Sequence, residues 1–158
     1  MTSIADVLSD IEHLSLSQAL AKSDHLVGAG LQVLHIAGFV MLLAGVLFIS
    51  LRLLGWVLPE QPLPLLSRSI LRLVSAGLVL ALASGIGMFI ASPQLYFYKP
   101  VFQFKLVLFV AAVAVHLLLL RRVARQPAPR PVLARASVAL SLLAWFGIGM
   151  AGRMIGFV

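Results

Sequence analysis

Cysteine is absent from the chain, and acidic residues are scarce: only five of the 158 residues are Asp or Glu. The lack of cysteine excludes disulfides, thiolate metal sites and cysteine nucleophiles. The sequence also has no motif of a hydrolase triad, no phosphate-binding loop and no paired carboxylates of the kind used in acid–base catalysis. We expect no removable signal peptide, because the N-terminus lacks a basic region and a cleavage site.

Apolar residues are abundant. Hydrophobic residues make up 61% of the chain, and the mean hydropathy is +1.08. A helix needs about 20 mainly apolar residues to cross a bilayer. Segments of this kind lie at about residues 26–51, 73–92, 101–120 and 136–158. We therefore predict an all-α fold, an integral membrane four-helix bundle that forms a single membrane domain over residues 1–158.

Residues 1–25 precede the first apolar segment and are expected to form a different kind of helix. Ser3 and Asp6 have the spacing of a capping box, in which two side chains satisfy free backbone N–H groups at a helix start. Apolar residues then recur at helical spacing, at Ile4, Val7, Leu8 and Ile11. This pattern predicts an amphipathic interfacial helix that lies on the membrane surface.

Positive charge is distributed unevenly between the two sides of the predicted bundle. The connections after the first and third segments contain Arg52, Arg68, Arg72, Arg121, Arg122, Arg125, Arg130 and Arg135. The opposite side has Lys22, Lys99, Lys105 and Arg153. By the positive-inside rule, both termini are periplasmic and the protein lies in the bacterial inner (plasma) membrane. The net charge of +7 is thus explained by topology, and we expect the lipid bilayer, and not nucleic acid, as a partner.

Polar and small residues gather on single faces of the predicted segments. The first segment has Gly28, Gln32, His35, Gly38, Leu42 and Gly45 on one face. The second has Gly77, Ala81 and Gly85, and the third has Lys105, Phe109, Ala112 and His116. The fourth has Ser141, Trp145, Gly149, Gly152, Arg153 and Gly156. We expect these faces to turn inward, because small residues let membrane helices approach closely.

Lys105 and Arg153 are cations within predicted spans, and none of the five acids lies in any span. A cation at the bilayer centre costs about 2.5–3.5 kcal/mol, and such groups usually pair or line a cavity. Two explanations stay open. Both side chains can extend to the outer headgroups, or an anion neutralises them. The candidate anions are the Val158 carboxylate, Asp24, a lipid phosphate and a bound ligand.

Haem b has the chemistry of such a ligand, because it is a flat apolar macrocycle with acidic propionates. In this hypothesis an outward-facing polar pocket uses His35 as an axial ligand, and Lys105 and Arg153 bind the propionates. The residues expected around the ring are Gln32, Gly38 and Trp145, and the second axial position falls to Met150, Met88 or water. His116 is expected about 9 Å deeper, as a packed or hydrogen-bonded histidine. Haem or porphyrin binding of this kind would suit membrane electron transfer.

Three alternatives use the same residues differently. His35 can form an interhelical hydrogen bond, in which case the protein is a cofactor-free accessory or structural subunit of a larger membrane complex. Copper can be held by His35 together with soft methionine ligands, which would be Met88, Met150 and Met154. Small-solute transport would require a homo-oligomer, because a chain of 158 residues leaves little room for a water path.

Four stretches of the chain also resemble a known family. They are LHIAGFVMLLAGVLFISLRLLG, LSRSILRLVSAGLVLALASGIGMFIASP, YKPVFQFKLVLFVAAVAV and SLLAWFGIGMAGRMIGFV. They are similar to small uncharacterised bacterial inner-membrane proteins that are known only as a domain of unknown function. The family's recurrent motif matches His35, Arg52, Gly85, Lys105 and the Gly152–Arg153 pair. A histidine on one helix and a lysine opening a later one more distantly resemble HemJ-type protoporphyrinogen oxidases and the membrane domain of copper resistance protein D. The family resemblance implies fold and location, and no activity.

Overall fold

The computed structural model describes residues 3–157, which contain helices and no strand. The all-α prediction is therefore confirmed for this part of the chain. In chain order the helices are α1 (Ile4–His13), α2 (Ser15–Ala21), α3 (His25–Leu53), α4 (Leu63–Ala91), α5 (Pro93–Phe97), α6 (Pro100–Val115), the π-helical η1 (His116–Leu120), α7 (Arg121–Ala124) and α8 (Pro131–Met154).

Four helical segments are long and apolar enough to cross a membrane: α3, α4, the continuous α6–η1–α7 segment and α8. The helix of the second span starts at Leu63, about ten residues before the predicted apolar stretch. Proline is tolerated in the first turn of a helix, where its missing N–H has no partner to lose. Pro64 occupies this turn of α4, and Pro131 likewise lies at the start of α8. Pro64 and Pro131 therefore lie in the first turns of helices and do not interrupt them.

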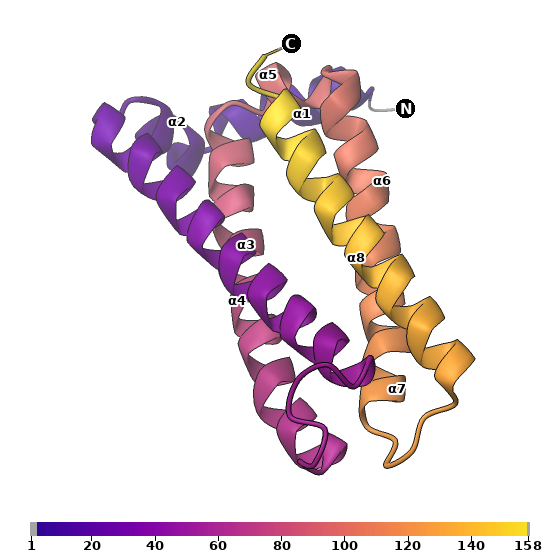
Figure 1. The fold of residues 1–158 in the computed structure, drawn as a ribbon. Coiled ribbons are helices and arrows are strands. Elements are labelled where there is room, and N and C mark those ends of the chain that lie inside the picture. Colours follow the sequence, from indigo (N-terminus) through magenta and orange to yellow (C-terminus); the bar gives the residue numbers. More distant parts are fainter. Residues whose placement is uncertain (1–2, 158) are drawn as a thin grey trace.

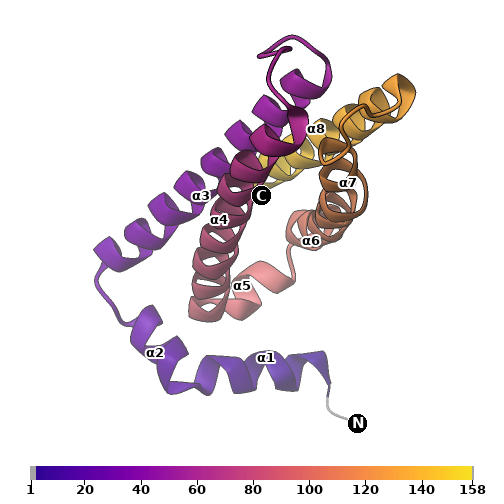
Figure 2. The ribbon, with the colours of Figure 1, turned by 90° about the horizontal axis from the view of Figure 1, so that it is seen from below.

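The four spans form two pairs, α3 with α4 and α6 with α8 (Figure 1). The loops 54–62 and 125–130 lie together at one end of the bundle, which we call the basic end (Figure 1). The helices α1, α2 and α5 lie at the opposite end, where α8 also finishes (Figure 1). Seen along the bundle, α1 and α2 extend sideways across this end (Figure 2).

Backbone contact between α3 and α4 holds the first pair together. A Cβ built on Gly38 would lie 2.6 Å from the backbone nitrogen of Ala81. A Cβ built on Gly77 would lie 2.6 Å from both the Gly38 oxygen and the Leu42 nitrogen. Any side chain at either glycine would push the helices apart. The predicted close approach of the small residues on the second span is therefore confirmed, and α3 is the partner.

The apolar core joins both pairs towards the basic end. Its largest fully buried side chain is Trp145, which packs edge-on against Phe109 at 6.4 Å between ring centroids. The buried core residues are Leu42, Val46, Ile49, Leu63, Val74, Ala112, Leu120, Ala124, Trp145 and Ile148. Farther from the basic end, the ring of Phe39 lies 3.1 Å from the Cβ position of Gly149 and links α3 to α8.

The N-terminal helices dock against the ends of α4 and α5. The predicted capping box is present, with Asp6 N–H donating to Ser3 Oγ at 3.3 Å and Ser3 N–H donating to the Asp6 carboxylate at 2.7 Å. On α2, Ser17 Oγ donates to the Ile90 carbonyl at 2.8 Å. Gln94 Nε2 donates to the Glu12 carboxylate at 2.9 Å. These bonds fix α1 and α2 across the end of the second span, as an interfacial segment requires.

Candidate functional site

His35 lies between α3 and α4, half-buried, with one ring nitrogen held by backbone. The Nδ1 atom is 2.7 Å from the carbonyl oxygen of Ala81. A carbonyl can only accept, so Nδ1 carries the hydrogen and donates it. In a neutral imidazole the lone pair then belongs to Nε2, which makes no hydrogen bond with the described residues. The ring is thus oriented, and its second nitrogen is free to bind another group.

Residues of α4 around Ala81 surround the His35 imidazole. Ser84 Oγ lies 3.4 Å from Nδ1 but donates its own hydrogen to the Leu80 carbonyl at 2.7 Å. A Cβ built on Gly85 would lie 3.0 Å from Cε1 of His35 and 3.2 Å from Nδ1. The absence of a side chain at Gly85 therefore gives the imidazole its room beside α4.

Lys105 enters the same region from α6. Its ammonium is close enough to His35 for the two to interact electrostatically. A Cβ built on Gly152 of α8 would lie 3.3 Å from the Lys105 Nζ. Within residues 3–157, no carboxylate pairs with this ammonium, and no hydrogen bond is made by it. His35 at the contact of α3 with α4 and Lys105 at the contact of α6 with α8 are therefore the polar groups of the candidate site.

Arg153 was predicted to act together with Lys105, but its side chain is turned to the surface of the bundle. Its side chain is exposed, and its guanidinium stacks over the ring of Phe157 at 4.7 Å. Asp24, one candidate partner, pairs with the neighbouring His25. The other protein candidate, the Val158 carboxylate, lies outside the described residues. Arg153 thus reaches the bundle surface, as the headgroup explanation for this residue requires.

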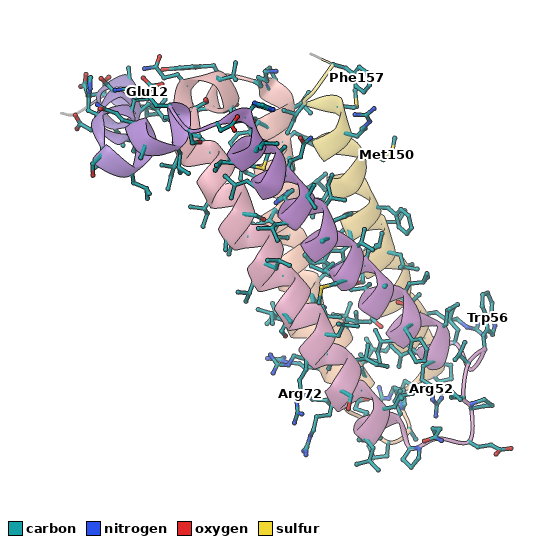
Figure 3. All side chains as sticks on the ribbon, turned by 90° about the vertical axis from the view of Figure 1, so that its left-hand side faces the viewer. Glu12, Arg52, Trp56, Arg72, Met150 and Phe157 are labelled. Atoms are coloured by element: carbon teal, nitrogen blue, oxygen red, sulfur yellow. The ribbon has the colours of Figure 1, made fainter. Side chains whose placement is uncertain are left out.

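The remaining predicted site residues are either exposed at the surface or buried in the helix packing. Gln32 is exposed on α3, and the Met150 side chain is 66% exposed on α8 (Figure 3). Gly38 faces α4, and Trp145 is 1% exposed in the core. His116 is also buried, at 3%, with no partner for Nδ1 among the described residues. The structure therefore places His35 between α3 and α4 and Lys105 between α6 and α8, and the other predicted site residues on the surface or in the packing.

A cavity of about 350 Å³ lies at the same end of the bundle, but beside a different part of the chain. Its walls come from α1, α2 and the junction of α4 with α5, and they include Glu12, Ser17, Lys22 and Ser92. None of the predicted haem-binding residues lines it. Among the described residues, no group of three His, Cys, Asp or Glu side chains is placed to hold a metal ion.

Two groups that contact His35 were not predicted from the sequence as parts of the site. The Ala81 carbonyl is a backbone group, and Ser84 is one of several serines in the apolar segments. Either could have been found only from the register of α3 against α4. The small residue Gly85, four positions after Ala81, was the available signal for that contact.

The fold and the site define the class of this molecule: a multi-pass integral membrane protein with an ordered histidine and an unpaired lysine between its spans. The chain belongs to DUF6644, a family of unknown function, whose model matches residues 19–158. The predicted membership of an uncharacterised family is thereby confirmed, whereas the comparisons do not show the distant resemblance to HemJ-type oxidases or copper resistance protein D. No curated protein and no solved structure matches the chain.

Proposed function

We propose that this protein binds haem b, or a related acidic porphyrin, between its two helix pairs, with His35 Nε2 as the axial ligand. The observation that carries the proposal is the 2.7 Å bond between Nδ1 and the Ala81 carbonyl. Metal-bound histidines usually donate their other N–H to a carbonyl or carboxylate, which fixes the tautomer and the ring orientation. His35 has this arrangement before any ligand is added.

The unpaired cation supports an acidic ligand. A desolvated ammonium without a counter-charge is unfavourable, and Lys105 finds no carboxylate within residues 3–157. A propionate beside Lys105 would neutralise it while the macrocycle occupies apolar surroundings. Arg153, stacked on Phe157 at the surface, is assigned to a second propionate or to a lipid phosphate.

Haem would supply one-electron chemistry, so the proposal includes a role in membrane electron transfer. We also propose that the protein lies in a bacterial inner membrane with both termini periplasmic. The arginines gathered at the basic end, in its loop 125–130 and in the adjoining helix ends, support this orientation through the positive-inside rule. The haem site would then lie in the periplasmic half of the bilayer.

Absorbance of protein purified in mild detergent tests the proposal. We expect a Soret band in the wild type that disappears in His35→Ala. His116→Ala is the matched control, because it removes another intramembrane histidine, one that is buried in the core, and we expect it to keep the band. A wild-type protein that stays colourless after growth with added haem contradicts haem binding.

A second candidate function is a cofactor-free accessory subunit of a larger membrane complex. The same His35–Ala81 bond favours it, because the bond joins α3 to α4 where Gly85 leaves room for the ring. Interhelical hydrogen bonds in membranes contribute about 0.6 kcal/mol on average. Copurification of a stoichiometric partner with a colourless protein would support this candidate.

Copper handling and solute transport receive less support than these two. Met150 and Met154 are 66% and 50% exposed on α8, so they do not converge on His35 as soft copper ligands should. His35 lines neither of the two cavities at the ends of the bundle, so neither cavity supports a solute path past it. Bound copper in protein prepared without chelators would revive the copper hypothesis.

A further inference from the structure

A second candidate site lies at the basic end, where α3 finishes, about 17 residues beyond His35 on the same helix. A cavity of about 240 Å³ opens there between the end of α3, the start of α4, the loop 125–130 and the start of α8. This volume corresponds to roughly eight waters at about 30 Å³ each. Its walls include Arg52, Leu53, Leu63, Pro129, Pro131 and Arg135. The cavity thus combines two guanidinium groups with an apolar wall.

Arg52 is fixed in place by the turn that ends α3. Gly55 has φ +78°, a backbone conformation that glycine adopts without strain. Its N–H donates to the Arg52 carbonyl at 3.1 Å, and the next N–H, of Trp56, donates to the Leu51 carbonyl at 3.0 Å. These two bonds are those of a Schellman motif. The chain therefore turns sharply at Gly55, three residues after Arg52.

The Arg52 side chain is only partly satisfied by the protein. Its Nη2 donates to the carbonyls of Pro59, at 3.1 Å, and Gln61. Its Nε is buried and has no partner among the described residues. An unpaired buried donor on a charged group is costly. The guanidinium is thus held by the loop 54–62 with hydrogen-bonding capacity left for another acceptor.

The basic end has little negative charge that could serve as this acceptor. The eight arginines from Arg52 to Arg135 are accompanied there by a single acid, Glu60. None of these arginines forms an ion pair within residues 3–157. Planar guanidinium groups bind phosphate with paired hydrogen bonds. The chemistry of the cavity therefore favours a phosphate oxygen.

The surroundings of the cavity favour a lipid as the source of such a phosphate. Trp56 follows Arg52 at the same end of the bundle (Figure 3) and is 74% exposed, as is typical of an interfacial tryptophan. Leu53 and Leu54, on the wall of the cavity, are half-buried at the end of the first span. Basic pockets between helices at this depth suit acidic headgroups. We propose that the cavity binds the phosphate of an anionic phospholipid between Arg52 and Arg135.

Native mass spectrometry of the full chain tests this site with added phosphatidylglycerol and phosphatidylcholine. We expect one retained phosphatidylglycerol per chain and no retained phosphatidylcholine. Arg135→Gln should weaken phosphatidylglycerol binding about fivefold, since one basic group near a lipid surface is worth about that factor. The matched control is Arg72→Gln, which removes the same charge from an exposed position outside the cavity (Figure 3), and we expect less than a twofold change.

Two variants and one competitor keep the site falsifiable. Arg135→Gln removes a side chain that makes no hydrogen bond to a loop. Arg52→Lys keeps the positive charge but loses the paired N–H donors of the guanidinium. Binding of phosphatidylglycerol should weaken in both variants. Equal losses in Arg135→Gln and Arg72→Gln would mean general surface attraction and would overturn the site. Retention of both lipids alike would overturn it as well. Displacement of phosphatidylglycerol by excess inorganic phosphate would assign the cavity to a small anion and overturn the lipid proposal.

Discussion

The ammonium of Lys105 lies directly against the backbone of Gly152. A Cβ at Gly152 would be 3.3 Å from Nζ and 3.6 Å from Cε of the lysine. The bare backbone of α8 therefore makes room for a cation that belongs to α6. No carboxylate of the described residues pairs with that cation, so an anion that neutralises it would come from outside this part of the chain.

Lys105→Met should stabilise the ligand-free protein. Replacing a poorly compensated buried charge by an apolar side chain of similar length commonly raises the free energy of unfolding by about 1–3 kcal/mol. Denaturant unfolding in detergent micelles, followed by circular dichroism, measures the change. Lys22→Met is the control, because Lys22 is exposed, and it should change the value by less than about 0.5 kcal/mol. A large loss of stability in Lys105→Met would show that the ammonium has a partner in the folded protein.

Gly85→Ala should disturb His35 selectively. The new Cβ would lie 3.0 Å from Cε1 of the ring, so the imidazole has to shift and its bond to Ala81 weakens. We expect a loss of about 1–2 kcal/mol in stability, as for other overpacked positions. Thermal unfolding of the purified protein measures it.

Gly87→Ala is the matched control on the same helix. Its Cβ would meet only the tip of the Leu31 side chain, at 3.3 Å, which can move aside. Its melting temperature should stay close to that of the wild type. If the two variants lose the same stability, the space at Gly85 is not specific to His35.

The spans were predictable from sequence because apolar length alone decides whether a helix can cross a bilayer. The start of α4 was not, because Pro62 and Pro64 serve equally well as helix breakers and as first-turn residues. The π-helical turn from His116 to Leu120 has no sequence signal that we recognise.

The site was predictable only in its chemistry. His35 and Lys105 stood out as polar groups in apolar segments, and the structure places them at the contacts of α3 with α4 and of α6 with α8. Arg153 is also a polar group in an apolar segment, but its position near the end of α8 lets its side chain reach the surface beside Phe157. The Ala81 carbonyl could not be predicted as a partner, because the pairing of α3 with α4 depends on where Gly38 meets Gly77.

Gly38→Ala and Gly77→Ala should each separate α3 from α4. The added Cβ atoms would lie 2.6 Å from backbone atoms, which cannot move aside as a side chain can. We expect each variant to lose about 3 kcal/mol of stability, at the upper end for overpacking. Unfolding in mixed micelles with increasing sodium dodecyl sulfate measures the loss.

Gly30→Ala provides the contrast for those two variants. Nothing lies within 4 Å of its Cβ position, and alanine is the better helix former by up to about 1 kcal/mol. The variant should be as stable as the wild type or slightly more stable. A loss at Gly30 equal to that at Gly38 would contradict the packing of α3 against α4.

Ser17→Ala should loosen α2 from the end of α4. The variant loses the 2.8 Å bond from Ser17 Oγ to the Ile90 carbonyl, which is worth about 1 kcal/mol. Hydrogen exchange of residues 15–21 should speed up about fivefold, with the four spans unaffected. Ser15→Ala, at an exposed position of the same helix, should leave the exchange rates unchanged. Unaltered exchange in Ser17→Ala would mean that the bond does not hold α2.

The most direct measurement of the central claim is an equilibrium titration of the ligand-free protein with haem b and, separately, with iron-free protoporphyrin. The porphyrin keeps the propionates but offers no iron to His35. We predict tighter binding of haem than of protoporphyrin by the wild type, loss of that difference in His35→Ala, and equal weakening of both ligands in Lys105→Met. If haem keeps its full advantage over protoporphyrin in His35→Ala, the imidazole is not the axial ligand and the proposed site is wrong.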